Sequence, residues 1–310
     1  MDQWLEKITD KIGVADLVHR LTDRLSGTEL NTLLLDLFRK KSTLKSINEL
    51  KNSFQQSRFF KPSSIDPILY KTLEIQCLSV VQSYLYTCIE LSPLTSFGTS
   101  SILAPIDQNM VVSAIRDSEV VSDATNVLAL IIADKLTANP DIMFRYACTH
   151  RHTRAQAFTN PAFTAHFGVL CLATGGIDQG DFTFEINQIQ EHIDIHIKLI
   201  KSFFPECPIY LKIMIRKCQP HYSAQLKSII HTAWEGLNIE WIDPAMDHSY
   251  YPHVQFKLFL CLNDQWIDLA DGGLVDWTQK LTQNRKQRMM ISGLGLELVY
   301  KLKAQMNHVS

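Results

Sequence analysis

Through most of its length, this chain mixes segments of helical periodicity with short β-prone runs, in no regular alternation. Residues 185–204 place apolar side chains at three-to-four spacing, which is typical of an amphipathic helix. Residues 208–215 favour a strand, and residues 254–262 and 265–269 favour a hairpin around the intervening Asn-Asp pair. Helices mixed with largely antiparallel strands indicate the α+β class.

Size and composition predict a globular protein of the cytosol. With 310 residues, 46% of them apolar, the chain can bury one large core or two modest ones. A net charge of −2 gives no overall positive field, so a nucleic-acid partner is not favoured. The seven cysteines form no CxxC pair and lie mostly in apolar runs, as expected of reduced thiols. No apolar run approaches the ~18 residues of a membrane span, and no export signal is present.

Residues 1–62 are predicted to form a helical region. Apolar residues recur at three-to-four spacing along its first third and make one continuous stripe. Ser26 or Thr28 can cap a second helix, and Ser42 can cap a third. No residue pattern in this region indicates chemistry, so we expect it to pack on the rest of the protein or on a partner.

Turn-forming residues at 61–67 separate this region from a second domain, which we place at 65–310. The second domain begins with a long, mostly apolar helical segment at 68–86. A strand-like segment that ends in proline follows at 88–93.

Three stretches then occur in one order along the chain: residues 122–129, residues 145–151 running on to 166–167, and residues 271–276 leading into 293–298. Together they resemble the catalytic core of a class II aminoacyl-tRNA synthetase of the histidyl type. The resemblance implies an antiparallel sheet flanked by helices, with one pocket for a small acid and ATP. It also implies that residues 68–95 form the interface of a homodimer.

In the family that this chain resembles, an acid and a threonine between a strand and a helix hold the amino group of the amino acid. Asp123 and Thr125 match those positions. A carboxylate and a hydroxyl suit the task because both accept hydrogen bonds from an ammonium group. The alternative is that Asp123 only caps the helix at 125–136.

The second motif matches the nucleotide side of the family's pocket. The resemblance assigns Arg151 to the α-phosphate of ATP and Phe167 to adenine, with Arg154 and His166 nearby. A guanidinium fork meets phosphate oxygens bidentately and stays charged. The acidic residue that the family carries two positions after the arginine is Thr153 here. The alternative is that the basic cluster of His150, Arg151, His152 and Arg154 is an ordinary solvated loop.

Two arginines of the family are missing. Tyr250 and Tyr251 match a paired tyrosine of the histidyl signature, but the arginine before it falls at Met246. Glu297 belongs to the third motif, whose arginine is replaced by Leu298. Losing one well-placed cation at a reacting phosphate costs on the order of 3 kcal/mol of transition-state stabilisation, so both losses together would suppress adenylation. The predicted ligand-binding residues are Asp123, Thr125, Arg151, Arg154, His166, Phe167, Tyr250, Tyr251 and Glu297.

We therefore predict a synthetase-like protein that does not aminoacylate and that binds an amino acid or a nucleotide-like ligand in a regulatory role. It is similar in kind to the regulatory subunit of ATP phosphoribosyltransferase. The motifs require no cofactor, although they leave room for ATP with Mg²⁺. One alternative is an ATP-dependent ligase that adenylates an unusual amino or carboxylic acid, and another is a scaffold with a vestigial pocket.

Transfer RNA and metal ions are not among the expected ligands. The chain ends about a dozen residues after the third motif, so we expect no C-terminal anticodon-binding domain and no charging of tRNA. His192 and His196 are four residues apart, a spacing that can bind a metal on a helix. Because no HExxH pattern or cysteine pair accompanies them, we predict a solvated helix face and no metal site.

Overall fold

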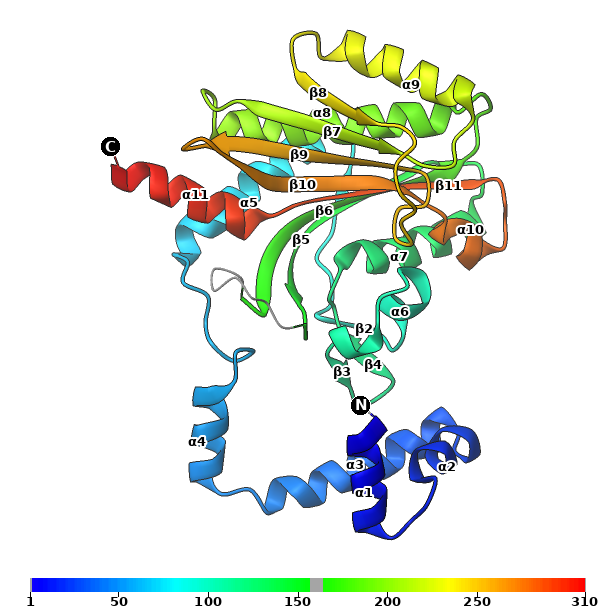
Figure 1. The fold of residues 1–310 in the computed structure, drawn as a ribbon, viewed down its shortest axis with the longest axis vertical. Coiled ribbons are helices and arrows are strands. Elements are labelled where there is room, and N and C mark those ends of the chain that lie inside the picture. Colours follow the sequence, from blue (N-terminus) through cyan, green and yellow to red (C-terminus); the bar gives the residue numbers. More distant parts are fainter. Residues whose placement is uncertain (1, 157–163, 310) are drawn as a thin grey trace.

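The computed structural model describes residues 2–156 and 164–309, and a twisted β-sheet lies at its centre (Figure 1). Among these residues eight strands form the sheet, in the order β1, β5, β6, β11, β10, β9, β7, β8. In that order their bounds are Thr87–Cys88, Phe144–Thr153, His166–Ile177, Gln287–Leu294, Gln265–Val275, Val254–Leu262, Ile209–Ile215 and Asn238–Ile242. β1 is parallel to β5 and β8 is parallel to β7, whereas the other neighbours are antiparallel. The predicted α+β class is confirmed, with these parallel pairs as a minor departure.

Helices cover both faces of this sheet. The helices on one face are α5 (Pro67–Gln82), α8 (Thr183–Phe203), α9 (Pro220–Ala233) and α11 (Leu296–Val309). The helices on the other face are α6 (Thr99–Leu103), α7 (Ala124–Ala138) and α10 (Trp277–Thr282). A short 3-10 helix, η1 (Gln108–Met110), and a small sheet of β2 (Leu94–Ser96), β4 (Ser118–Val120) and β3 (Ser113–Ala114) complete this side. No helix among the described residues has the length and apolarity needed to cross a bilayer.

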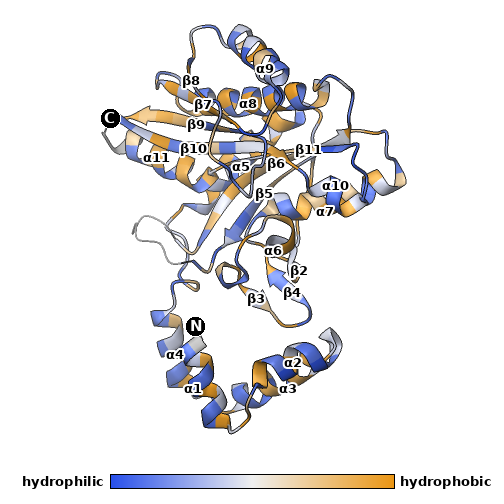
Figure 2. Cartoon of the chain, turned by 45° about the vertical axis from the view of Figure 1, so that its right-hand side comes forward, coloured by the Kyte–Doolittle hydropathy of each residue, from blue (hydrophilic) through white to orange (hydrophobic). Residues whose placement is uncertain are grey.

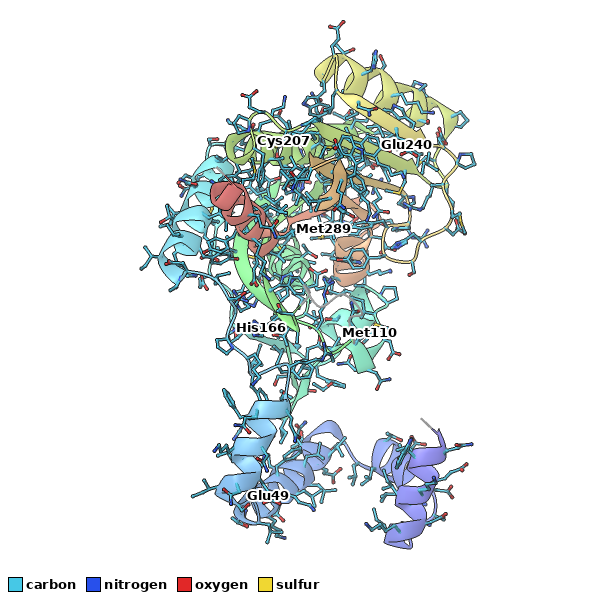
Figure 3. All side chains as sticks on the ribbon, turned by 60° about the vertical axis from the view of Figure 1, so that its left-hand side comes forward. Glu49, Met110, His166, Cys207, Glu240 and Met289 are labelled. Atoms are coloured by element: carbon cyan, nitrogen blue, oxygen red, sulfur yellow. The ribbon has the colours of Figure 1, made fainter. Side chains whose placement is uncertain are left out.

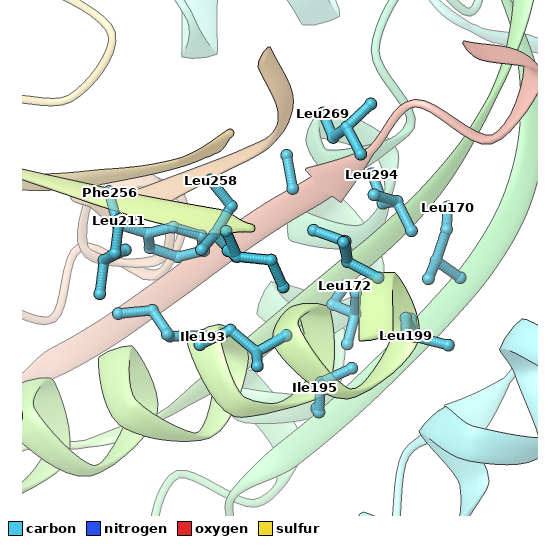
Figure 4. Close-up of a cluster of buried hydrophobic side chains, with 14 of the residues drawn as sticks. Leu170, Leu172, Ile193, Ile195, Leu199, Leu211, Phe256, Leu258, Leu269 and Leu294 are labelled. Carbon is cyan, nitrogen blue, oxygen red and sulfur yellow. The ribbon is translucent and has the colours of Figure 1, made fainter. Parts of the chain in front are cut away.

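Strand alternation builds a separate core on each face. In β6, Leu170 and Leu172 point into the core beneath α8, whereas Cys171 and Ala173 point into the core beneath α7. Figure 4 shows the first of these cores, where leucines of the sheet meet isoleucines of α8. Each fully buried large side chain contributes roughly 1.5–3 kcal/mol, so these two cores hold the fold together.

Several elements follow the sequence pattern closely. β9 and β10 form the expected hairpin, and Asn263 and Asp264 both have positive φ, as a tight two-residue turn requires. The strand expected at 88–93 is wrong in extent, because only Thr87 and Cys88 join the sheet. The polar loop expected between the strands of the second motif falls on residues 157–163, outside the described residues.

The expectation of a solvated face at His192 and His196 is wrong. Both imidazoles are fully buried between α8 and the sheet. His192 Nδ1 and His196 Nε2 lie 2.7 and 2.8 Å from Ser292 Oγ in β11, and Tyr86 Oη lies 2.8 Å from His192 Nε2. The two histidines therefore satisfy a polar network inside the core, in which burial lowers both of their pKa values.

The N-terminal residues form an arm of four helices below the sheet domain (Figure 1). These helices are α1 (Asp2–Ile12), α2 (Leu17–Arg24), α3 (Gly27–Thr43) and α4 (Ile47–Gln56). No residue of α2, α3 or α4 is buried, and Figure 2 shows apolar residues along the arm. Asn31 Oδ1 joins the arm to the domain by accepting hydrogen bonds from the backbone N–H groups of Arg116 and Asp117, at 2.7 and 3.1 Å.

Local capping sets the helix boundaries in the arm. Ser26, one of the two expected caps, caps α3: its Oγ accepts the backbone N–H of Glu29, and its own backbone N–H donates to the Glu29 carboxylate. The cap expected at Ser42 is wrong, because α3 continues through it and Ser46 caps α4 with Glu49. The single stripe expected over the first third is also divided, because α1 ends at Ile12 and α2 begins only at Leu17.

Candidate functional site

The N-terminus of α7 carries the centre of the candidate site. Asp123 Oδ1 accepts hydrogen bonds from the backbone N–H and the hydroxyl of Thr125, at 2.9 and 2.7 Å. Tyr250 Oη donates to Asp123 Oδ2 at 2.5 Å. Asp123 therefore does cap the helix, and its carboxylate also accepts hydrogen bonds from the hydroxyl groups of Thr125 and Tyr250.

Two adjoining cavities open onto this carboxylate. The first cavity has a volume of about 280 Å³. Its lining includes six of the nine predicted ligand-binding residues: Asp123, Thr125, Arg154, Phe167, Tyr250 and Tyr251. The second cavity has a volume of about 570 Å³ and shares Asp123, Arg154, Tyr250 and Tyr251 with the first. Most of the predicted site is thus brought together from β6, α7 and two loops.

Arg154 lies over the ring of Phe167. Its guanidinium carbon is 5.2 Å from the ring centroid, which is within the range of a cation–π contact. Its Nε donates to the carbonyl oxygen of Ser122 at 3.3 Å. One face of the ring that the resemblance assigns to adenine is therefore covered by an arginine, which keeps a positive charge in the first cavity.

A second carboxylate, Asp271, lines both cavities. Burial, with Asp268 and Asp123 nearby, raises the pKa of Asp271 to about 6. Burial alone would also raise the pKa of Asp123, but His152, Arg154 and the two hydroxyls outweigh it and hold that pKa below its ordinary value. The sequence marked Asp271 only as part of a turn, although an acid beside two glycines of a strand could have signalled a role in the pocket.

Asp123, His152 and Cys171 place one possible metal-ligand atom each within 4.8 Å of one another. Their hydrogen bonds do not fit a metal, however. His152 Nε2 accepts the backbone N–H of Ala124 at 3.0 Å, so its lone pair is already used. A hydrogen bond with Cys148, together with burial, raises the pKa of Cys171 well above its usual range, which keeps it a thiol. These three residues stabilise the wall of the cavity instead.

Three predicted ligand-binding residues lie elsewhere. Arg151 Nη1 donates to Glu297 Oε2 at 2.8 Å and lies 3.0 Å from His166 Nδ1. Glu297 is buried and also bonds to Ser63 and Lys301, at 2.7 and 3.0 Å. Figure 3 labels His166 at the start of β6, where its Nε2 lies 2.7 Å from the carbonyl oxygen of Lys61 in the linker.

The alternation of side chains along β5 explains why Arg151 lies apart from the first cavity. Arg151 pairs with Gly168 in the ladder and His152 pairs with Phe167, so consecutive residues of β5 face opposite sides of the sheet. His152 and Phe167 face the first cavity, whereas Arg151 lines a third cavity beside α5. The expectation that Arg151 meets a ligand beside Asp123 therefore disagrees with the structure.

The positions of the two missing arginines lie outside the cavity linings as well. Met246 is 90% exposed, and Leu298 packs against the core beneath α8. Arg145 does not replace them, because it is bound by Glu191 at 2.9 Å on the α8 side of the sheet. The basic cluster of the second motif is not a solvated loop, because His152 is only 2% exposed.

No known family matches this sequence, and no curated protein matches it. The fold, in contrast, matches solved structures. Histidyl-tRNA synthetase from S. aureus has a TM-score of 0.61 at 15% identity, covering 78% of this chain and 68% of that one. An ATP phosphoribosyltransferase regulatory subunit/histidyl-tRNA synthetase from Bacillus halodurans has a TM-score of 0.61 at 13% identity, covering 79% and 82%.

A histidine–tRNA ligase subunit from Alicyclobacillus acidocaldarius also has a TM-score of 0.61, at 9% identity, covering 81% of this chain and 98% of that one. A putative threonyl-tRNA synthetase from Aeropyrum pernix has a TM-score of 0.60 at 11% identity, covering 78% of this chain and 60% of that one. At these identities the similarity concerns the fold. The chain has the fold of a class II aminoacyl-tRNA synthetase core, of the kind found in histidyl-tRNA synthetase and its regulatory-subunit paralogue.

Proposed function

We propose that this protein binds a small ligand with a primary ammonium group, an amino acid or an amino-acid-like compound, without aminoacylating it. The observation that carries the proposal is the convergence of Asp123, Thr125 and Tyr250 at the wall of a cavity. A carboxylate can accept more hydrogen bonds than Asp123 already receives, so an ammonium can still bind it. Asp271 adds a second negative charge above its pKa of about 6.

The scarcity of positive charge in the first cavity supports a role without adenylation. Arg154 is the one lysine or arginine among the described residues that line it, and residues 157–163 contain neither type. Charge that develops on a reacting phosphate needs several cationic partners held in place. Arg151 is committed to Glu297 instead. A regulatory role, like that named for the B. halodurans neighbour, is part of this proposal.

Exchange of labelled pyrophosphate into ATP, with Mg²⁺ and each of the twenty standard amino acids, separates this proposal from the adenylating alternative. We expect no exchange above background with any of them. Robust exchange with one would establish an ATP-dependent ligase, and its loss in Arg154→Gln would identify the cation responsible. Equilibrium binding of the same amino acids shows whether the pocket is occupied or vestigial.

The proposal includes a homodimer through residues 68–95. Three large apolar side chains of α5 support it, because they are mostly exposed: Ile68 at 74%, Leu69 at 61% and Ile75 at 65%. Apolar residues grouped on an exposed helix are typical of a contact with another chain.

A further inference from the structure

Arg216, which directly follows β7, is a buried cation with an incomplete set of partners. It is only 5% exposed. Its Nε donates to the carbonyl oxygen of Met246 at 2.6 Å, and its Nη2 donates to Gln255 Oε1 at 3.1 Å. Its Nη1 has no hydrogen-bond partner among the described residues, although it is buried. Burying a guanidinium with a free N–H group is unfavourable unless something else satisfies it.

No carboxylate among the described residues forms an ion pair with Arg216. Asp247, which follows Met246 in the loop between β8 and β9, is 71% exposed at its side chain and pairs with Lys217 at 2.9 Å. Among the described residues, Arg216 has only neutral acceptors, namely these two oxygen atoms and the Sδ atom of Met214, which lies 3.8 Å from Nη2. A buried guanidinium without a carboxylate partner, at the wall of a cavity, is suited to bind a negatively charged group of a ligand.

The second cavity brings Arg216 together with Arg154. Lys257 lines it as well, but its ammonium is already bound to Asp268 at 2.6 Å. Asp123 and Asp271 stand on the wall that this cavity shares with the first. Arg154 lines that shared wall as well, whereas Arg216 lines only the second of the two cavities. The combined space therefore offers both positive groups and carboxylates to a ligand that carries both charges.

We infer that Arg216 and Arg154 form a subsite for an oxyanion group, a carboxylate or a phosphate, on the ligand whose ammonium meets Asp123. The inference rests on the proposed function and narrows its ligand to a zwitterion. A guanidinium presents two parallel N–H groups to an oxyanion, which gives the subsite its chemistry.

Thermal-shift titrations with sodium phosphate and with sodium acetate, against sodium chloride at equal ionic strength, test this subsite in the full chain. We expect Tm to rise with the logarithm of the concentration of at least one of the two anions. The rise is expected to disappear in Arg216→Gln and to remain in Arg285→Gln, which removes an exposed arginine outside the cavities. A response to acetate alone assigns a carboxylate, and a response to phosphate alone assigns a phosphate.

Absence of any anion-specific rise in the unmodified protein overturns the inference, as does an equal rise in Arg216→Gln. Should Arg216→Gln not fold, Arg216→Lys carries the test. It keeps the charge but not the fork, so the anion's Kd is expected to weaken about tenfold or more, and an unchanged Kd contradicts the subsite. Asp123→Asn is expected to keep the anion response, because it removes a negative charge. Failure of the ammonium site is thereby distinguished from failure of the oxyanion subsite.

Discussion

Asp271 lines the proposed ligand pocket, and its charged form lowers the stability of the folded protein. Its carboxyl group is held in a buried wall near Asp123, and its pKa of about 6 lies well above the 3.8 of a free aspartate. The folded protein therefore favours the neutral acid, whereas binding of a cationic ligand needs the carboxylate. Below about pH 6, we expect the affinity for an ammonium ligand to fall.

Replacing Asp271 by asparagine should reveal the cost of this charge. A raised pKa in the folded state means that stability is lost as the pH rises from about 4 to about 6. At pH 7.5, Asp271→Asn should therefore have a free energy of unfolding up to about 3 kcal/mol higher than that of the unmodified protein, as measured by chemical denaturation. This difference should vanish below pH 4. Asp264→Asn, in an exposed turn, is the control. An advantage that does not depend on pH would contradict the assignment.

Gly168 is required by a close approach of α5 to β6. A Cβ atom at this position would lie 1.7 Å from the hydroxyl of Tyr70, which is only 4% exposed. Gly168→Ala should therefore reduce the free energy of unfolding by about 1–3 kcal/mol, measured by chemical denaturation. Gly27→Ala has no atom within 4 Å of the new methyl group and should cause no loss. Equal effects of the two changes would disprove the clash.

At the scale of elements, Ser292 ties α8 to the middle of the sheet. Its hydroxyl lies within hydrogen-bond distance of both His192 and His196, and the Nδ1 atom of His196 has no partner of its own among the described residues. Ser292→Ala would leave a nitrogen of each histidine buried and unpaired. We expect a loss of roughly 2–4 kcal/mol, because each unpaired group costs about 1–3 kcal/mol.

Ser202→Ala serves as the control for this prediction. Ser202 also lies in α8, but it is exposed and bonds only to a carbonyl group of its own helix. Its replacement should change the free energy of unfolding by less than about 0.5 kcal/mol. If Ser292→Ala were equally mild, the buried network would not be what holds α8 against β11.

Local sequence patterns predicted where the helices, strands and turns lie better than they predicted which way the side chains face. The Asn-Asp turn, the cap at Asp123 and the strands of the second motif depend on neighbouring residues, and sequence reasoning found them. Arg151 was assigned to the pocket because its motif matched, but one step along a strand reverses the side of the sheet that a residue faces. The burial of His192 likewise depends on how α8 docks on β11, which periodicity alone does not reveal.

At the scale of the whole molecule, two cores share one sheet and a helical arm leaves it with little buried surface. The pocket lies on the α7 side of the sheet, where the second core ends. The exposed apolar residues of α5 lie on the α8 side. The proposed ligand site and the proposed dimer interface therefore lie on opposite faces of the sheet, and a change in one should leave the other intact.

A charge on α5 tests the proposed dimer. Ile75→Glu should convert a dimer to a monomer in sedimentation equilibrium, because a carboxylate at an apolar interface loses its hydration. Ile47→Glu, at an 85% exposed position of the arm, should leave the dimer unchanged. A monomeric unmodified protein, or a dimer that survives Ile75→Glu, would contradict an interface through residues 68–95.

The most direct test of the account is a thermal-shift titration of the unmodified protein and of Asp123→Asn with each of the twenty standard amino acids. Asparagine preserves the cap of α7 but removes the negative charge from the cavity. The account predicts that at least one amino acid raises Tm of the unmodified protein and that this rise is lost in the variant. No rise with any amino acid, or an equal rise in both proteins, would contradict it.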